Sequence, residues 1–459
     1  MIGYSKRFNT IVLGVGGMGS AVCYELAKRG KRVLGIDRFD IPNDMGSSHG
    51  YTRIIRLAYY EHPSYVMLLR RAYELWTEIE NRTGQQVLVK TGSIDAGPAD
   101  SWVFKGSLQS CVEHGLEHEV LTGAEINSRF PGYNFPHDLL GVLQPDGGFV
   151  LPEPATVAYV QAAHALGAEI HGREEVLGWQ PLGQGEGVRV ITDRAEYEAD
   201  SLVITGGAWN AQLLPFLRGY AIPERQVLAW LQPERPQHFT PETFPVFNVL
   251  VPEGRYYGFP VHTVPGFKFG KYHHFEEVVD PDTYDREPNF EDEAVLRDFA
   301  SRYFPEGAGP TMRLTACMFT NSPDKHFIID LHPEYPQVSF AAGFTGHGYK
   351  FASVVGEIMA DLAQRQESRH NISLFNVARL TGQVSNLYKN LPGMRVSAGK
   401  RVSPQPRGRI ARPNRSTPRG TRRIPSKLGI SSPGQIHQDY NHDSSDPRYW
   451  EKEDVKPFW

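Results

Sequence analysis

Three glycines near the N-terminus constrain the fold of this chain more than any other feature. Gly14, Gly16 and Gly19 stand in the order GxGxxG, between a β-branched run at 10–12 and a helix-like stretch at 18–29. In this order the first glycine permits a tight turn, the second lets the backbone approach a pyrophosphate, and the third lets helix and strand pack closely. The stretch therefore predicts a strand, a glycine turn and a helix in direct succession.

The residues after this helix indicate what the turn binds. A second apolar run, 33–36, ends in an acid, Asp37. An acid at the end of the second strand accepts hydrogen bonds from an adenosine ribose, and the helix N-terminus offers amide groups to the pyrophosphate. The unit therefore predicts a bound ADP moiety. NAD and FAD both carry ADP, so the unit alone does not distinguish them.

Length and composition indicate a two-domain globular protein. The chain has 459 residues, of which 40% are hydrophobic. It has no apolar run of membrane-spanning length, and its first ten residues lack the hydrophobic region of a signal peptide, so we expect an intracellular protein with no membrane partner. The three cysteines, Cys23, Cys111 and Cys317, lack metal-type spacing, so we expect neither disulfides nor a metal site.

Apolar patterning predicts a mixed α/β fold in which two kinds of structure alternate along the chain. Helical spacing after Pro63, at 155–166 and after residue 350, with strand-like runs at 188–192, 201–205 and 338–342, fits a nucleotide-binding domain. Alternating aromatic and β-branched residues in 222–315 predict an antiparallel sheet. We therefore expect a discontinuous Rossmann-type domain (1–85, 150–220 and 316–383) interleaved with an antiparallel-sheet substrate domain (86–149 and 221–315).

The C-terminal part differs in composition from the rest. It is rich in Pro, Ser, Arg and Gly without periodicity, so we predict a disordered tail over 384–459. Residues 395–427 hold 11 Lys and Arg and no Asp or Glu, although the whole chain has a net charge of −4. We interpret this stretch as a solvated tail and expect no nucleic-acid partner. Residues 426–428, SKL, spell a peroxisomal signal that acts only at a C-terminus, so both cytoplasm and peroxisome stay open.

Further motifs stand in the order of one known family. They are GVGGMG (14–19), GSSHGYTRIIR (46–56), YYGFP (256–260), FKFGK (267–271), ACMFTNSPDKHFIID (316–330) and GHGYKFASVVGEI (346–358). Over residues 8–383 the chain resembles the monomeric sarcosine oxidase and N-methyltryptophan oxidase group of FAD-dependent amine oxidases. The resemblance implies FAD as cofactor and a monomer. It also implies oxidation of the C–N bond of an N-methyl or cyclic amino acid, with O2 reduced to H2O2.

The resemblance also implies roles for single residues. Cys317 would carry the flavin through its 8α-methyl group. Arg56 and Lys350 would bind the substrate carboxylate, and Tyr257 would lie beside the substrate. Lys268 would activate oxygen by its positive charge. The remaining residues expected to line or hold the flavin are His49, Thr52, Arg53, Gly346, His347 and Gly348, and Lys350 is expected beside the flavin as well.

The sequence departs from the family at positions that line the substrate pocket. Ser48 replaces a histidine, Tyr51 replaces an aspartate, and Phe319 lacks the hydroxyl of close relatives. A catalytic histidine of the family corresponds to either Tyr272 or His273. The substrate is therefore left open, whereas the cofactor is not.

Two alternative functions remain from the sequence. One is a flavin-dependent biosynthetic dehydrogenase or cyclase that uses the same fold with another acceptor or product. The other is a nucleic-acid- or partner-binding protein that acts through the basic stretch 395–428.

Overall fold

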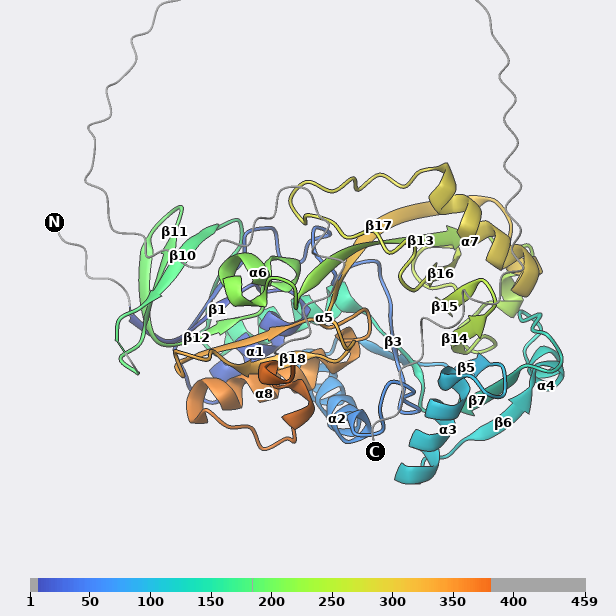
Figure 1. Cartoon of the computed structure of the whole chain (residues 1–459), viewed down its shortest axis with the longest axis horizontal. Helices are drawn as coiled ribbons and strands as arrows, with labels where there is room; N and C mark the ends of the chain where they lie inside the picture. Colours follow the sequence, from blue (N-terminus) through green and yellow to red (C-terminus); the bar gives the residue numbers. More distant parts are fainter. Residues whose placement is uncertain (1–6, 184, 381–459) are drawn as a thin grey trace, which may run out of the picture. The chain divides into compact units, whose positions relative to one another are not determined.

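The structure is a computed structural model that describes residues 7–183 and 185–380 (Figure 1). Within these residues the strands form two large sheets and one small one. The predicted disordered tail, 384–459, and the SKL tripeptide lie outside the described residues. No helix in the described part is long and apolar enough to cross a membrane.

The first sheet is built around the unit predicted from the glycines. β1 (Arg7–Leu13) leads into α1 (Gly17–Lys28) and β2 (Val33–Ile36), and β1 pairs in parallel with both β2 and β12 (Glu196–Ile204). The predicted strand, turn, helix and strand are therefore confirmed. The order is β10-β11-β12-β1-β2-β9, with β19 beside β12 and β18 beside β19. The other strands are β9 (Glu169–His171), β10 (Val176–Pro181), β11 (Val188–Thr192), β18 (Ile328–Leu331) and β19 (Val338–Ala342).

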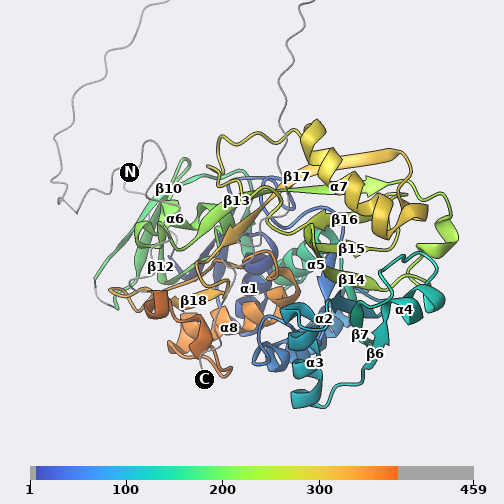
Figure 2. The same ribbon diagram turned by 45° about the vertical axis from the view of Figure 1, so that its right-hand side comes forward.

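Helices from distant parts of the chain cover this sheet. α1 packs against α5 (Pro152–Ala165) and α8 (Ala352–Arg365), and α2 (Tyr65–Thr83) packs against both of these (Figure 2). α2 ends at Gly84, whose φ of 70° suits glycine. The apolar face predicted for α2 is buried, namely Leu68, Leu69, Ala72, Leu75, Trp76 and Ile79.

The second sheet is antiparallel, as predicted, except at one pair. Its order is β17-β13-β16-β15-β14-β5-β7-β6, and only β5 and β14 run parallel among its described pairings. Its strands are β5 (Ser93–Gly97), β6 (Glu119–Thr122), β7 (Leu140–Gln144), β13 (Ile222–Leu231), β14 (Val246–Val251), β15 (Gly254–Phe259), β16 (Phe267–Lys271) and β17 (Thr311–Asn321).

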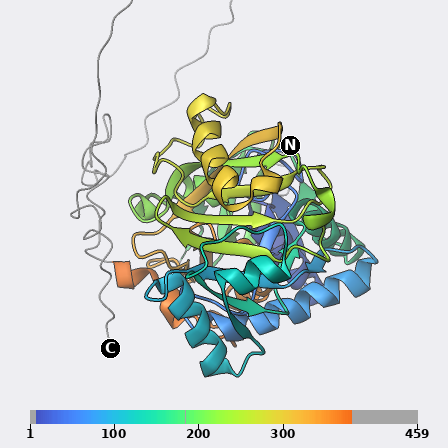
Figure 3. The same ribbon diagram turned by 90° about the vertical axis from the view of Figure 1, so that its right-hand side faces the viewer.

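Helices lie on both faces of the second sheet. Figure 3 shows α7 (Phe290–Tyr303) and α3 (Trp102–His114) on opposite sides of its strands. The sequence reading of 86–150, short strands with one helix near residues 100–113, agrees with α3, whereas no helix was predicted at α7. Its start carries a readable signal, because Asn289 and Asp292 form a capping box. The shorter helices are α4 (Gly123–Arg129) and α6 (Asn210–Leu213).

A small third sheet is formed by three short strands from separate parts of the chain. It consists of β3 (Arg53–Ile55), β8 (Gly148–Val150) and β4 (Leu88–Lys90). The proposed division into two discontinuous domains stays a prediction. The domain boundary predicted at residue 316 falls inside β17, and the whole of β17 belongs to the second sheet.

Candidate active site

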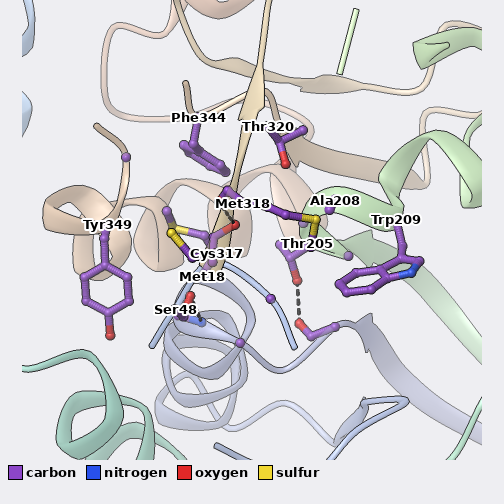
Figure 4. Close-up of a pocket in the computed structure, with 18 of the residues that line it drawn as sticks. Met18, Ser48, Thr205, Ala208, Trp209, Cys317, Met318, Thr320, Phe344 and Tyr349 are labelled. Atoms are coloured by element: carbon purple, nitrogen blue, oxygen red, sulfur yellow. Dashed lines mark hydrogen bonds between the residues drawn. The ribbon is translucent and has the colours of Figure 1, made fainter. Parts of the chain in front are cut away.

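A cavity extends from the glycine turn of the first sheet to the second sheet (Figure 4). Tyr349 and Trp209 lie toward opposite ends of it in this view, and Cys317 of β17 lies between them. The predicted site residues that line it are Gly14, Gly16, Asp37, Arg53, Tyr257, Cys317, Gly346, His347, Gly348 and Lys350. Gly19, Thr52, Arg56 and Lys268 are predicted site residues that do not line it, and His49 lines a second cavity instead.

The glycine turn has the shape that a pyrophosphate requires. A Cβ on Gly14 would lie 2.6 Å from the Thr205 carbonyl oxygen, and a Cβ on Gly19 would lie 1.8 Å from the Gly14 carbonyl oxygen. Thr205 Oγ1 also donates a hydrogen bond to that oxygen (2.8 Å), which closes the turn (Figure 4). At Gly16, by contrast, a Cβ would meet nothing closer than Ser48 Oγ at 3.9 Å. Gly16 is therefore the glycine that faces open space, where a pyrophosphate would approach the backbone.

Asp37 uses its carboxylate to hold this turn. Oδ2 accepts from the Val15 amide (2.7 Å), and Oδ1 accepts from the Phe39 amide (2.9 Å). Burial raises the pKa of Asp37, against the lowering effect of these two amides. The side chain lines the cavity where the adenosine end of a dinucleotide was expected. Its remaining lone pairs are the ones a ribose would use.

Strand pairing brings the other predicted residues to one face of the second sheet. Tyr257 of β15 lies opposite Gly270 of β16, and Phe259 lies opposite Lys268. Because side chains alternate between the two faces of a strand, Tyr256, between Tyr257 and Arg255, belongs to the aromatic core on the other face. Polar and titratable residues thus gather on the cavity face, while the opposite face packs against α7.

Lys268 is buried behind the cavity wall. Its Nζ donates to the carbonyl oxygens of Gly50 and Thr52 (2.8 Å each) and to Thr52 Oγ1 (2.9 Å), and it lies 4.3 Å from the ring centroid of Phe259. Burial and the Arg53 charge lower the pKa of Lys268 well below its usual value. Three oxygen acceptors nonetheless match the three protons of an ammonium group, which favours its charged form. Lys268 therefore fixes the loop at 50–52 and places a positive charge there.

Arg56 is held by two internal carboxylates. Its Nη2 donates to Glu61 Oε2 (2.8 Å), its Nε lies 3.5 Å from Asp95 Oδ1, and its guanidinium lies 3.9 Å from the ring centroid of Tyr60. Burial raises the pKa of Glu61, but Arg56 outweighs it and brings that pKa to about 2. Burial raises the pKa of Asp95 to about 6, because there Arg56 compensates only in part. The predicted carboxylate-binding arginine is therefore already paired.

Lys350 and His347 lie on the cavity side of this cluster. Lys350 Nζ donates to the His347 carbonyl oxygen (2.9 Å), and burial together with the Arg56 charge lowers the pKa of Lys350 to about 7. His347 Nε2 lies 3.0 Å from the Lys325 carbonyl oxygen, which can only accept, so Nε2 carries the proton. Nδ1 then accepts from Tyr59 OH (2.6 Å). Burial lowers the pKa of His347 to about 3, so its ring is neutral.

The three cysteines differ in their surroundings. Cys23 in α1 and Cys111 in α3 are buried and do not line the cavity, as expected of structural cysteines. Cys317 lines the cavity from β17. Burial raises the pKa of Cys317, and the charges of Arg53 and Lys268 lower it in part. Among the three, Cys317 is therefore the thiol placed to meet a ligand in the cavity.

Sequence reasoning missed several lining residues. Thr320 is the most informative, because its buried Oγ1 has no hydrogen-bond partner among the described residues. Thr320 stands three residues after Cys317 in the same motif, and this position is the sequence signal that could have identified it. Trp209 and Phe344 also line the cavity, and each comes shortly after a first-sheet strand, β12 or β19, and the glycine that follows it.

A sequence model of the family described as FAD dependent oxidoreductase matches residues 9–362. The chain belongs to this family. It is 41% identical over 382 residues to the monomeric sarcosine oxidase of Bacillus sp. (strain B-0618), which covers 82% of this chain and 97% of that protein. It is 34% identical over 376 residues to the N-methyl-L-tryptophan oxidase of Yersinia pestis, covering 81% and 99%.

Solved structures show the same fold. NikD, described as an unusual amino acid oxidase essential for nikkomycin biosynthesis, has a TM-score of 0.71 at 24% identity, over 81% of this chain and 97% of that one. The L-proline dehydrogenase of P. horikoshii has a TM-score of 0.71 at 22% identity, over 83% and 99%. The mixed α/β fold expected from the sequence is thus that of the FAD-dependent family.

The residues of the cavity fit FAD. Gly16 leaves backbone free at the expected pyrophosphate position, the Thr320 hydroxyl has no partner among the described residues, and Cys317 presents a thiol in the cavity wall. These groups belong to one continuous cavity, so one extended ligand could meet all of them.

The two glycines give a test of this fit that does not depend on turnover. In Gly16→Ala the new methyl group enters only cavity space, so we expect a folded protein whose affinity for FAD falls by about tenfold or more. In the matched variant Gly19→Ala the methyl group clashes with backbone, so we expect the free energy of unfolding to fall by about 3 kcal/mol. Thermal unfolding of the two proteins, and FAD titration of each in a Cys317→Ser background that cannot form a thioether, measure this contrast. Unchanged FAD affinity in folded Gly16→Ala would contradict the assignment.

Proposed function

We propose that this chain is an oxidase of secondary amino acids, N-methyl or cyclic, that converts the C–N bond to an imine and reduces O2 to H2O2. The observation that carries the proposal is the single cavity that starts at Gly16 and contains Cys317, Tyr257 and Lys350. The proteins named sarcosine oxidase and N-methyl-L-tryptophan oxidase, at 41% and 34% identity, support it.

FAD supplies the electron transfer. When bound, it would accept a hydride equivalent, that is two electrons and one proton, from the amine, whose nitrogen loses a second proton, and would pass both electrons to O2, so that amine and oxygen become imine and hydrogen peroxide. Water then hydrolyses the imine to a carbonyl compound and an amine. The protein's task is to orient the α-carbon hydrogen and to exclude competing water.

Lys350 is the residue placed to bind the substrate carboxylate directly. It lines the cavity as it stands, whereas Arg56 reaches a substrate only after its contact with Glu61 opens. A carboxylate beside Lys350 would favour its protonated form and counter the pKa lowering caused by burial. Tyr257, half-buried and lining the same cavity, would pack against the body of the substrate.

We also propose that Cys317 carries FAD through a thioether to the 8α-methyl group. The bond replaces one S–H and one methyl C–H bond and releases two electrons and two protons, for which O2 is the acceptor. The position of Cys317 in the cavity wall and the nearby positive charges of Arg53 and Lys268, which favour the thiolate, support this link.

A panel of amines tests the function. Purified protein should release hydrogen peroxide with sarcosine, other N-methyl amino acids or pipecolate, read by a peroxidase-coupled dye, and catalase should abolish the signal. Primary amino acids serve as controls, and we expect weaker turnover with them. No peroxide from any secondary amine in the panel, with FAD bound, would contradict the proposal.

A further inference from the structure

Arg255 occupies an unusual position at the substrate end of the second sheet. It precedes Tyr257 by two residues on β15, so both side chains leave the same face of the strand, about 7 Å apart. Tyr257 lines the cavity. Arg255 therefore lies one strand repeat beyond Tyr257, on the same face of the sheet.

Aromatic rings hold the guanidinium of Arg255. Its carbon lies 3.6 Å from the ring centroid of Tyr272, 4.9 Å from that of Trp102 and 5.7 Å from that of Tyr60. Tyr272 itself lines the cavity, and Trp102 is 44% exposed. The guanidinium thus lies between the cavity wall and solvent.

A buried polar chain fixes these rings. Asn248 Oδ1 accepts from Tyr60 OH (3.1 Å) and from Tyr272 OH (3.5 Å), and Asn248 Nδ2 donates to Asp95 Oδ1 (2.7 Å). Asn248 and Asp95 are fully buried and lie opposite each other on β14 and β5. Hydrogen bonds to buried residues therefore hold two of the rings that contact Arg255 in place.

Arg255 has no counter-ion of its own in the described part of the chain. No hydrogen bond or ion pair joins its guanidinium to a carboxylate there. Three other arginines that are buried or partly buried are each paired with a carboxylate: Arg56 with Glu61, Arg225 with Asp292, and Arg29 with Asp361. A fixed, partly desolvated guanidinium with free donors is the usual device for binding a carboxylate.

We propose that Arg255 binds a second carboxylate of the substrate, so that this enzyme prefers amino acids with an acidic side chain or an acidic N-substituent. The inference rests on the proposed oxidation of secondary amines at the same cavity. With the α-carboxylate at Lys350, the second carboxylate reaches Arg255 past Tyr272. Arg56, Lys350 and Arg255 then stand against Glu61 and Asp95, and a substrate with two carboxylates and one protonated amine adds the one missing negative charge.

Two unreactive thioethers test the inference without turnover. Methylthioacetate and thiodiacetate replace the amine nitrogen by sulfur and differ by one carboxylate. Titrated into the FAD-loaded protein and read by the change in flavin absorbance, thiodiacetate should bind about tenfold more tightly. In Arg255→Leu the ratio of the two dissociation constants should fall to about one, and Arg255→Lys should restore part of it.

A control variant and a kinetic comparison complete the test. Arg129→Leu removes an exposed arginine that also lies over an aromatic ring but outside the cavity wall, and it should keep the parent ratio. The ratio of kcat/KM for N-methyl-L-glutamate over N-methyl-L-alanine should follow the same pattern. A parent protein that binds both thioethers equally, or a ratio that survives in Arg255→Leu, would overturn the inference. Discrimination between thioethers without peroxide from any amine would overturn the proposed function instead.

Discussion

Replacing Cys317 by serine will turn the acid-precipitated protein from yellow to colourless. The parent protein should keep its flavin through denaturation, because a thioether survives acid whereas all non-covalent contacts are lost. Serine differs from cysteine mainly in the sulfur, and its hydroxyl is far less acidic than a thiol, so it forms no such bond. The absorbance of the washed pellet, redissolved in denaturant, measures the difference.

The control for this result is a cysteine outside the cavity. Cys111→Ala removes a buried thiol in α3 and should leave the pellet yellow, as should Cys23→Ala in α1. Mass spectrometry of the peptide that contains Cys317 should find the added mass of FAD. A colourless pellet from the parent protein would refute the covalent link while leaving FAD binding itself intact.

Replacing Lys268 by methionine should slow the reaction with oxygen by about 10² to 10³-fold. Methionine keeps the length of the side chain but removes the charge next to Phe259 and the three hydrogen bonds to the loop at 50–52. Stopped-flow measurement separates the two halves of the reaction: reduction by amine without oxygen, and reoxidation on mixing with oxygen. We expect the loss in the second half, with turnover on an artificial electron acceptor largely kept.

Lys271 provides the matched control on the same strand. It is three residues along β16, opposite Tyr256, and therefore on the other face of the sheet. Lys271→Met should leave both half-reactions unchanged. An equal loss in both halves for Lys268→Met would mean that the lysine only supports the loop. No loss in either half would favour a dehydrogenase that uses another acceptor.

The local parts of this fold could be predicted from the sequence. The strand, turn and helix around Gly14, Gly16 and Gly19 follow from residues within one short stretch, and the buried face of α2 follows from helical spacing. Cys317 and Lys350 were placed near the flavin through the family's motifs, and both line the cavity.

The environment of the substrate end could not be predicted in the same way. Asp95 and Asn248 belong to β5 and β14, and Tyr272 directly follows β16; the register of these strands depends on pairings between distant segments. Nothing local to Arg56 indicates that Asp95 will lie beside it. The aromatic rings around Arg255 are brought together by the same pairings, so the sequence shows Arg255 only as an ordinary strand residue.

The parallel pairing of β5 with β14 also has a consequence for biosynthesis. These strands are more than 140 residues apart in the chain, and β17, which carries Cys317, is the last strand of the sheet to leave the ribosome. Contacts between such distant segments form late, because the intervening chain must first be closed into a loop. If Cys317 carries the flavin as proposed, attachment can therefore begin only after the last strand of this sheet has been made. A nascent chain that stops before β17 would expose the long edge of β13, where chaperones or aggregation compete with folding.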